Sequence, residues 1–343
     1  MQSSQPAGRM TPPPANDPSA LVASLAGRRV LVLGDLFLDE YLEGRTERLS
    51  REAPVPVVEL TRRTTVPGGA ANPAHQVVAL GGQAVLAGLV GDDEAGHTLV
   101  GQLQESGVDT SGVVIDRARS TTLKTRLVAF RDALRFPQHL ARVDRLDRTP
   151  LEGETLARLL DRLAVLVPTV DVLVVSDYRG GVLLPEVVEA ITAEARSSGV
   201  WTAVDSQGNL AKYAGFGLIK CNRAETESEL GLPLAGDADY ERALARLLPR
   251  LHAGMLVITR GPEGMSLQAQ GGHAEHLPAA NRSEVYDVTG AGDTVIAVLA
   301  MALAAHLSLH TAAHLANAAA GVVVRRLGNV AVTPQELVAE LTR

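Results

Sequence analysis

The sequence predicts an α/β fold built on a mostly parallel sheet with helices on both faces. Three observations predict it: short apolar runs recur along the chain, helical patterns separate them, and polar residues follow most of the runs at once. Continuous apolar runs are typical of strands that are covered on both faces. Ligands bind such sheets beyond the carboxyl ends of the strands. We therefore expect the functional site at that edge.

Five apolar runs are predicted to be strands of this sheet, at residues 28–34, 172–176, 202–204, 218–220 and 255–259. Four of them are followed by an acid or an asparagine, namely Asp35, Asp177, Asp205 and Asn222. Helices are predicted at Gly153–Leu166, Pro185–Ser197 and Tyr240–Leu251. The first has leucines at 156, 159, 160 and 163, which is the spacing of one buried helix face.

Two stretches interrupt the alternation, at residues 40–66 and about 113–147. Their β-branched residues favour strands and their prolines favour edge strands. We predict that they form a small second sheet, a lid. Residues 1–20 carry Pro6, Pro12, Pro13, Pro14 and Pro18 without an apolar stretch, which predicts a flexible tail rather than a signal peptide. Residues 21–343 are expected to form the folded domain.

Composition excludes several classes of partner. The 343 residues include 32 basic and 39 acidic ones, a net charge of −7, and only 3% are aromatic. Nucleic acids and anionic membranes need a basic face, so neither is an expected partner. The longest apolar run, Val295 to Ala305, is short of the roughly 20 residues that cross a bilayer. Cys221 is the single cysteine, which fits a reducing compartment, and a cytoplasmic location is expected.

One glycine-rich segment has the pattern of an anion site. Residues 287–294 read Asp-Val-Thr-Gly-Ala-Gly-Asp-Thr and precede an apolar helix. Glycines at a helix N-terminus let backbone N–H groups approach an anion, which the helix dipole favours. Asp293 could then accept a proton from an alcohol that attacks a phosphoryl group. The alternative is that Asp293 only caps or charges the first turn.

A second segment, residues 67–74, reads Pro-Gly-Gly-Ala-Ala-Asn-Pro-Ala. Paired glycines allow the backbone to approach a ligand closely, and the amide of Asn72 both donates and accepts hydrogen bonds. The alternative is a tight turn before a helix at Ala74–Leu80.

Taken together and in this order, the two segments resemble the signature regions of the ribokinase-like (PfkB) carbohydrate kinases. Within that family the chain is most similar to the D-glycero-β-D-manno-heptose-7-phosphate kinases, the kinase part of bifunctional heptose kinase/adenylyltransferases. The resemblance covers residues 28–341, and the segments that carry it are 34–39, 52–57, 67–72, 176–178, 285–294 and 317–324. It implies the three-layer ribokinase-like fold, with the lid over the sugar.

The resemblance also implies a reaction, the transfer of the γ-phosphoryl of ATP to a hydroxyl, most closely the anomeric hydroxyl of a heptose 7-phosphate. Asp293 would be the catalytic base, and the backbone amides of Gly290, Ala291 and Gly292 would form the anion hole. The implied sugar-binding residues are Asp39, Gly69 and Asn72, with Arg142 and Asp144 near the substrate. The implied nucleotide-binding residues are Asn222, Glu225, Thr259, Gly261, Gly264 and Asn317.

The resemblance implies three further partners. Mg²⁺ would accompany ATP, organised by Glu225 through water. Asp287 and Thr289 match positions that hold a monovalent cation, K⁺, in some relatives. Lids of this kind often pair between subunits, so a homodimer is expected. A competing interpretation of Arg142 and Asp144 is a solvated, charged strand.

The chain departs from the heptose kinases at two places. Residues 205–208 read Asp-Ser-Gln-Gly where those enzymes carry Asp-Pro-Lys-Gly, and Arg179 follows Ser-Asp-Tyr where they carry Ala-Lys-Gly. The lysine missing at Gln207 keeps a different sugar, sugar phosphate or nucleoside open as the acceptor. A non-catalytic sugar or nucleotide sensor is the alternative from another class.

Other motifs are interpreted as structural or are absent. His310 and His314 are expected on a helix surface, and Cys221 in the core. The sequence contains neither a P-loop motif nor the His-x-Gly-His of the adenylyltransferases.

Overall fold

The computed structural model describes residues 17–343 apart from 131–137, 150, 282–284, 286 and 327. In these residues a nine-stranded sheet has the order β13-β12-β11-β10-β9-β8-β1-β4-β5. Its strands are parallel except at the β12 and β13 edge. They are β1 (Arg29–Gly34), β4 (Gln83–Gly91), β5 (Asp109–Asp116), β8 (Val172–Asp177), β9 (Trp201–Ser206), β10 (Leu218–Asn222), β11 (Met255–Thr259), β12 (Met265–Ala269) and β13 (Glu275–Leu277).

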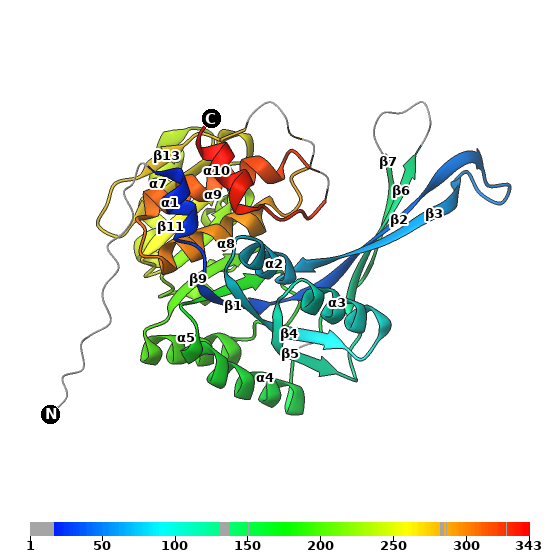
Figure 1. Cartoon of the computed structure of the whole chain (residues 1–343), viewed down its shortest axis with the longest axis horizontal. Helices are drawn as coiled ribbons and strands as arrows, with labels where there is room; N and C mark the ends of the chain where they lie inside the picture. The colour runs from blue at the N-terminus through cyan, green and yellow to red at the C-terminus, as the bar shows by residue number, and fades with distance from the viewer. Residues whose placement is uncertain (1–16, 131–137, 150, 282–284, 286, 327) are drawn as a thin grey trace.

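Helices cover both faces of this sheet (Figure 1). On one face lie α1 (Pro18–Ala23), α2 (Ala71–Ala79), α3 (Glu94–Glu105), α8 (Ala291–Ala304), α9 (Leu309–Val323) and α10 (Pro334–Leu341). On the other lie α4 (Gly153–Leu166), α5 (Pro185–Ser198), α6 (Arg223–Leu230) and α7 (Asp237–Arg250). Side chains alternate along a strand, so Val30 and Val32 of β1 enter one core and Leu31 and Leu33 the other. The predicted three-layer fold is confirmed.

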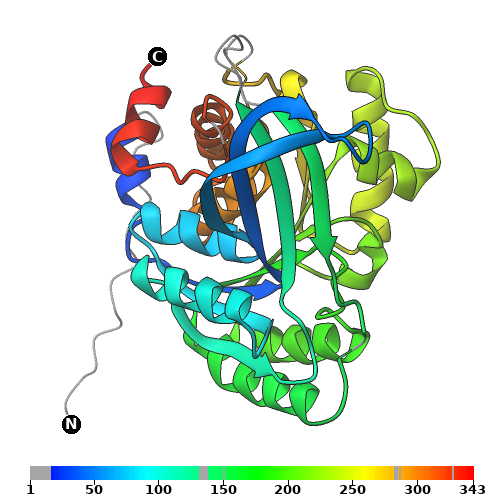
Figure 2. The same cartoon turned by 90° about the vertical axis from the view of Figure 1, so that its right-hand side faces the viewer.

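A second sheet, of order β3-β2-β6-β7 in the described residues, stands off the main body as the predicted lid (Figures 1 and 2). It consists of β2 (Leu36–Leu49), β3 (Pro56–Gly69), β6 (Thr122–Phe130) and β7 (Gln138–Arg145). β2 pairs antiparallel with β3 and parallel with β6. The proline-containing β3 is an edge strand, as predicted.

Several boundaries differ from the sequence-based expectation. Two helices begin three residues earlier than predicted, α2 at Ala71 instead of Ala74 and α7 at Asp237 instead of Tyr240. The lid and the N-terminus differ as well. The lid resumes at Thr122 rather than near residue 113, because Val113 and Val114 belong to β5, which pairs with β4 at the edge of the main sheet. The folded part begins before residue 21. α1 starts at Pro18, and Asp17 caps it by accepting the N–H groups of Ser19 and Ala20 at 2.9 and 3.3 Å. The rest of the predicted tail lies outside the described residues.

Three smaller expectations concern single residues and the surface. Cys221 is buried, as predicted. His310 and His314 lie exposed on α9 with ring centroids 4.7 Å apart, and no group of three or more metal-ligating side chains occurs among the described residues.

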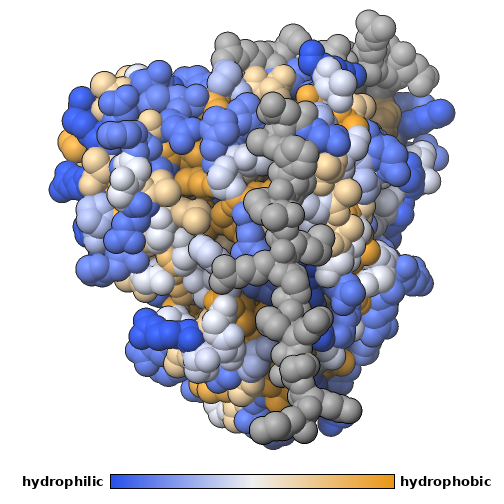
Figure 3. All heavy atoms as spheres, turned by 60° about the vertical axis from the view of Figure 1, so that its left-hand side comes forward, coloured by the Kyte–Doolittle hydropathy of each residue, from blue (hydrophilic) through white to orange (hydrophobic). Residues whose placement is uncertain are grey.

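Hydrophilic residues cover much of the face drawn in Figure 3. Within the part of the chain that the structure describes, no helix combines the length and apolar character needed to cross a membrane.

Candidate active site

The loops after the parallel strands meet the N-terminal ends of α2 and α8 at the carboxyl edge of the main sheet, where the sequence predicts the site. A small polar cavity of about 160 Å³ lies there. Its lining comes from the ends of β8, β9 and β10 and from α6 and α8, and consists of Asp177, Tyr178, Asp205, Gln207, Lys220, Asn222, Glu225, Gly290, Gly292 and Asp293. Segments distant in sequence therefore share one site.

Asp293 is buried in the first turn of α8. One carboxylate oxygen, Oδ2, accepts a hydrogen bond from Nδ2 of Asn72 at 2.8 Å, and Oδ1 accepts one from the hydroxyl of Tyr178 at 2.7 Å. Gly290 is the N-cap of this helix, its φ of 76° suits a glycine, and no side chain caps the helix. Asp293 therefore does not cap its own helix, although it does place a negative charge in the first turn, as the alternative interpretation also allowed.

The environment of Asp293 makes it a better base than an exposed aspartate. Burial raises the pKa of this carboxyl to about 6, and the charge of Asp205 acts in the same direction. The hydrogen bonds from Tyr178 and Asn72 and the charge of Lys220 act the other way and lower the pKa. A carboxylate with a pKa of about 6 is ionised near neutral pH and accepts a proton more readily than an ordinary one.

Lys220 supplies a buried positive charge beside α8. Its Nζ lies 2.6 Å from Oδ2 of Asp205 and 3.0 Å from the point where a Cβ on Gly292 would lie. The absence of a side chain at Gly292 therefore lets the ammonium group approach the helix N-terminus. In the predicted anion hole, the N–H of Ala291 donates to the carbonyl of Val288 at 3.3 Å. An anion in this cavity would meet both an ammonium group and a helix dipole.

Of the predicted sugar-binding residues, Asn72 contacts Asp293 directly, and Asp39 is connected to it through other polar side chains. The carboxylate of Asp39, on β2, is buried. It accepts hydrogen bonds from Nη1 of Arg126 at 2.5 Å and from Nδ2 of Asn329 at 3.4 Å. Oδ1 of Asn329 in turn lies 3.5 Å from Nδ2 of Asn72, the donor to Asp293. A chain of polar contacts thus connects Asp39 to the candidate base.

Gly69 is required by backbone packing. Its φ is 63°, and a Cβ there would lie 2.2 Å from the carbonyl oxygen of Asp35. The glycine pair therefore serves the close approach of the start of α2 to the turn between β1 and β2. The alternative interpretation of residues 67–74, a tight turn before a helix, therefore applies. The same turn also places Asn72 at the site.

A basic cavity of about 340 Å³ opens beneath the lid. Four cationic side chains line it, namely Lys124, Arg142, Arg148 and Arg179, together with three carboxylates, those of Asp35, Asp144 and Asp147, and with Gln207 and Tyr178. Nζ of Lys124 lies 3.1 Å from the centre of the Phe37 ring, and burial lowers the pKa of this lysine to about 8. The cavity offers an anionic group several cations at once.

Arg142 and Asp144 form a two-pronged ion pair on β7. Nε and Nη2 of the arginine each donate to one carboxylate oxygen at 2.7 Å. All of β7 is exposed, yet both side chains also line the basic cavity. The two interpretations of the pair are therefore compatible, since a charged strand in solvent can still form the wall of a site.

Four of the six predicted nucleotide-binding residues line a separate, largely apolar cavity of about 340 Å³. It contains Thr259, Gly261, Gly264 and Asn317 together with Val288, Val295, Ala320 and Val324. Asn317 fixes one wall, because its Nδ2 donates to the carbonyl of Pro278 at 2.7 Å and its Oδ1 accepts the N–H of Ala280 at 3.3 Å. Aliphatic walls with a few fixed polar groups suit a flat aromatic ligand. Gly292 borders both this cavity and the polar one.

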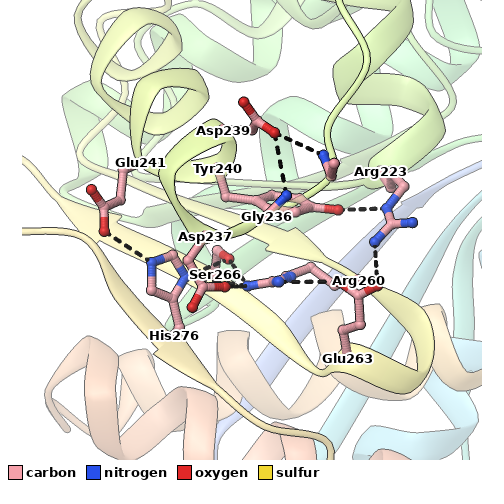
Figure 4. A network of polar contacts seen from close by, with 11 residues as sticks. Arg223, Gly236, Asp237, Asp239, Tyr240, Glu241, Arg260, Glu263, Ser266 and His276 are labelled. Carbon is pink, nitrogen blue, oxygen red and sulfur yellow. Dashed lines mark hydrogen bonds and ion pairs between the residues drawn. The ribbon is translucent and has the colours of Figure 1, made fainter.

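A polar network behind the cavity ties its loops together (Figure 4). The buried guanidinium of Arg260 lies 2.6 Å from Asp237 and 3.0 Å from Glu263, and 4.2 Å from the Tyr240 ring centre. Glu263 also pairs with Arg223 at 2.7 Å, and Arg223 donates to the Tyr240 hydroxyl at 2.5 Å. The start of α6 and the loop after β11 are thus braced against each other.

Asn222 and Glu225 reach the polar cavity from a reciprocal helix cap. Oε2 of Glu225 accepts the N–H of Asn222 at 2.7 Å, and Oδ1 of Asn222 accepts the N–H of Glu225 at 2.9 Å. Burial, and then the charge of Asp205, raise the pKa of Glu225. A cation beside Glu225 would relieve this unfavourable charge. Mg²⁺ is commonly held by one or two carboxylates with water and phosphate, so these residues fit it.

Asp287 and Thr289 are engaged with each other. Oδ1 of Asp287 accepts the N–H and the hydroxyl of Thr289 at 2.9 and 2.7 Å, and Oδ2 accepts the N–H of Gly328 at 2.8 Å. Both oxygens therefore already face donors, so the two side chains as placed do not form a ready cation site. The monovalent cation stays a prediction, and no step is derived from it.

Several residues of the site were not assigned a role from the sequence. Lys220 leaves a visible signal, because a charged residue interrupts an otherwise apolar run. Tyr178 carries a signal only as part of the Ser-Asp-Tyr motif, which gives it no role of its own. Arg126 and Asn329 leave no local signal, since their contacts to Asp39 span 87 and 290 positions.

Comparisons with known proteins agree with this geometry. The chain is 41% identical over 315 residues to the bifunctional protein HldE of Trichlorobacter lovleyi, covering 92% of this chain and 63% of that protein. It is 44% identical over 324 residues to the protein of the same name from Caulobacter vibrioides, covering 93% of this chain and 64% of that one. The chain thus spans less than two thirds of the length of these relatives.

Solved structures share the fold. Phosphofructokinase-2 from Escherichia coli in complex with substrates and products aligns with a TM-score of 0.75 at 21% identity, covering 93% of this chain and 100% of that one. Ribokinase from Arabidopsis thaliana complexed with ribose and ATP aligns with a TM-score of 0.72 at 18% identity, covering 93% and 99%. The family model "pfkB family carbohydrate kinase" matches residues 28–336. The chain therefore belongs to the pfkB family of carbohydrate kinases, whose members use a nucleoside triphosphate and a divalent metal to phosphorylate a sugar or sugar phosphate.

Proposed function

We propose that this protein transfers the γ-phosphoryl of ATP to a sugar that already carries a phosphate, most closely to the anomeric hydroxyl of a heptose 7-phosphate. One observation carries the proposal. The buried carboxylate of Asp293 lines the polar cavity at the positively charged end of α8, and that cavity shares Gly292 with the apolar cavity and Tyr178 and Gln207 with the basic one. The resemblance to the heptose kinases supports the choice of acceptor.

In this mechanism the chain's own residues act mainly by position and charge. Asp293 accepts the proton of the acceptor hydroxyl, while Asn72 and Tyr178 hold its two oxygens in place. Lys220 and the backbone N–H groups of Gly290, Ala291 and Gly292 stabilise the charge on the transferred group. Mg²⁺, held near Glu225 through water, would supply further neutralisation of the phosphate charge when bound. Asp39 binds a sugar hydroxyl beside Asp293.

The basic cavity supports a phosphorylated acceptor. The heptose kinases carry a lysine where this chain has Gln207. Here Lys124, Arg142, Arg148 and Arg179 line the same cavity as Gln207 and outnumber its three carboxylates. Arg142 already pairs with Asp144, so the positive charge that is available comes mainly from the other three. Arginine binds phosphate with two parallel hydrogen bonds and lysine as a point charge, so either type can replace the missing lysine.

The apolar cavity supports ATP as the donor. Its aliphatic walls and Asn317 fit a purine ring, and Thr259, Gly261 and Gly264 lie on the side that leads toward Gly292. A nucleotide lying from Asn317 toward Gly292 would bring its terminal phosphate to the polar cavity. Lys220, Asn222 and Glu225 line that cavity.

The lid supports a homodimer with subunits joined through the second sheet. It exposes large apolar residues, namely Leu49, Leu60 and Val143 on its strands and Val55 between β2 and β3. Exposed apolar groups on one projecting element are typical of an interaction surface. We also expect a cytoplasmic location, because the single cysteine fits a reducing compartment. Light scattering after size-exclusion chromatography tests the dimer, and V143D should shift it toward the monomer.

The test of function is ADP release with Mg-ATP and a panel of acceptors: heptose 7-phosphate, ribose, fructose, fructose 6-phosphate and a nucleoside. Selective use of heptose 7-phosphate is expected. Activity with another acceptor alone would keep the kinase and discard the heptose assignment. Inactivity with the whole panel, combined with ATP or sugar binding, would favour the sensor.

Lys124 tests the phosphate assignment. K124A should raise the KM for the phosphorylated acceptor and leave the KM for ATP nearly unchanged, because Lys124 lines the basic cavity and not the apolar one. The control is R117A, because Arg117 is exposed, pairs with Asp92 at 3.4 Å and does not line the basic cavity. An equal rise of both KM values would place the phosphate elsewhere.

A further inference from the structure

We infer that Asp35 is a positioning residue, which fixes the two segments that deliver Tyr178 and Asn72 to Asp293. The inference rests on the proposed function, in which Asp293 is the base. Asp35 occupies the single position between β1 and β2, where the main sheet passes into the lid. It lies at the junction of the elements that form the site.

The carboxylate of Asp35 holds the loop after β8. Oδ2 accepts the N–H groups of Tyr178 and Gly180, both at 2.8 Å, and Oδ1 accepts the N–H of Val182 at 3.3 Å. Three alternate backbone donors of one loop thus converge on one buried carboxylate. Because Tyr178 is the first of these residues, the direction of its side chain depends on this anchor.

The backbone of Asp35 holds the start of α2. Its carbonyl oxygen accepts the N–H of Ala70 at 3.0 Å, and its own N–H donates to the carbonyl of Ser176 at 3.3 Å. Ala70 is the N-cap of α2, and Asn72 lies in the first turn of that helix. The same residue therefore places both hydrogen-bond donors to Asp293.

Packing around Asp35 leaves no room for other arrangements. A Cβ on Gly180 would lie 2.7 Å from Cγ of Asp35, and a Cβ on Gly69 would lie 2.2 Å from its carbonyl oxygen. Between these contacts Arg179 adopts a φ of 60°, which is unusual for a residue with a side chain. The loop thus contains the strained Arg179 beside the tightly packed Gly180. The hydrogen bonds that the Asp35 carboxylate accepts stabilise this backbone conformation.

The charge of Asp35 is costly, which argues for a specific role. Burial is the main cause that raises the pKa of this carboxyl, and the charge of Asp177 acts in the same direction. The hydrogen bonds from Gly180, Val182 and Tyr178 oppose both effects. A buried carboxylate is tolerated only where hydrogen bonds compensate it, and here the compensating donors are the backbone of the site loop.

The experiment compares D35N with wild type in kcat, both KM values and the pH dependence of kcat. In D35N an amide N–H₂ replaces one carboxylate oxygen and opposes at least one backbone N–H. We expect kcat to fall by about 10- to 100-fold, the range that misplacement of a catalytic group costs, with the KM for ATP nearly unchanged.

The pH profile separates positioning from general destabilisation. The titratable groups that act on Asp293 are Tyr178 after β8, Asp205 on β9 and Lys220 on β10. The Tyr178 hydrogen bond lowers the pKa of Asp293, so its loss raises that pKa and moves the acidic limb to higher pH. The Asn72 hydrogen bond lowers the pKa of Asp293 as well. D35N and Y178F should therefore shift the limb in the same direction, and the double variant should shift it by less than the sum of the two single shifts, because Y178F already removes the part that acts through Tyr178.

Two further variants complete the test. D171N is the matched control at the opposite end of β1, where Asp171 also accepts a backbone N–H, from Arg29 at 2.8 Å. It should leave the limb in place. G180A pushes the loop away from Asp35 while keeping the carboxylate. If D35N fails to fold, the acidic limb of G180A tests the positioning role in its place.

The outcomes are distinct. A wild-type protein without kinase activity overturns the proposed function. An active wild type whose D35N and G180A variants keep the wild-type acidic limb overturns the inference about Asp35 alone. A shifted limb in either variant, with D171N unchanged, supports it.

Discussion

Lys220 and Gly292 fit together across the site: the ammonium nitrogen lies 3.0 Å from the position that a Cβ on Gly292 would occupy. A methyl group there is closer than ordinary van der Waals contact, so G292A should push the ammonium away from the first turn of α8. We expect kcat to fall by about tenfold or more, the range for the loss of one charge-stabilising group. Steady-state kinetics checks this, and A300G in the middle of the same helix is the control.

Replacement of the base should separate chemistry from binding. D293N removes the proton acceptor, so turnover should fall by about 10²- to 10⁴-fold, the contribution of a general base. ATP should still bind with nearly wild-type affinity, because Asp293 does not line the apolar cavity. Single-turnover kinetics and calorimetric ATP titration test the two parts. Turnover within a few-fold of wild type would remove Asp293 from the base role.

The pH dependence of both activity and stability should follow Asp293. The base works when ionised, so kcat should fall as pH drops through the pKa of about 6. The pKa of Asp293 in the folded protein lies above the 3.8 of an exposed aspartate, so burying the ionised group costs stability above pH 6 and costs none well below pH 4. D293N should therefore gain stability relative to wild type at pH 8, of the order of 1–3 kcal/mol, and lose that gain toward pH 4. Chemical denaturation at both pH values measures it.

Asp39 should act on the sugar side. D39A removes a carboxylate that lies beside the base and pairs with Arg126, so the KM for the sugar should rise more than the KM for ATP. Loss of one partner of a buried ion pair also destabilises the fold, by about 3–5 kcal/mol. The double variant D39A/R126M, which removes both charges, should recover part of that stability without restoring the KM. A rise confined to the KM for ATP would refute the placement.

Arg260 should act on the nucleotide side. R260A removes the guanidinium that braces the loop after β11, so the KM for ATP should rise by about tenfold, equivalent to roughly 1.4 kcal/mol. R242A is the matched control, because Arg242 forms an exposed ion pair with Asp239 on the solvent side of α7. Equal effects of the two substitutions on the KM for ATP would contradict the bracing role.

Much of the fold could be predicted because its elements carry local signals. The run at 255–259 and the helix Gly153–Leu166 have the predicted bounds, since apolar runs and helical periodicity are properties of neighbouring residues. The lid boundary was wrong for the same reason. Val113 and Thr122 both lie in β-favouring segments, and only their partners, β4 and β2, assign them to different sheets.

The site was predictable to a lesser degree. Motifs carried by the resemblance pointed to Asn72, Asp293, Asn222 and Thr259, which do converge on adjoining cavities. The polar partners that hold these residues in place could not be predicted from the sequence, because a contact such as that of Asn329 with Asp39 depends on how distant segments pack. A glycine motif likewise does not say whether its space is meant for a ligand or, as at Gly69, for the chain itself.

The residues that surround Asp293 lie far apart in the sequence, so the ribosome adds them at widely separated times. Asn72 precedes it by 221 positions and Tyr178 by 115, whereas Asn329, which bridges to Asp39, comes still later. A growing polypeptide on the ribosome therefore completes both sheets before it possesses a proton acceptor. Contacts over such separations also form slowly. A nascent chain that stops short of α8 lacks Asp293, so in the proposed mechanism an incomplete chain has no base and cannot consume ATP by phosphorylating a sugar.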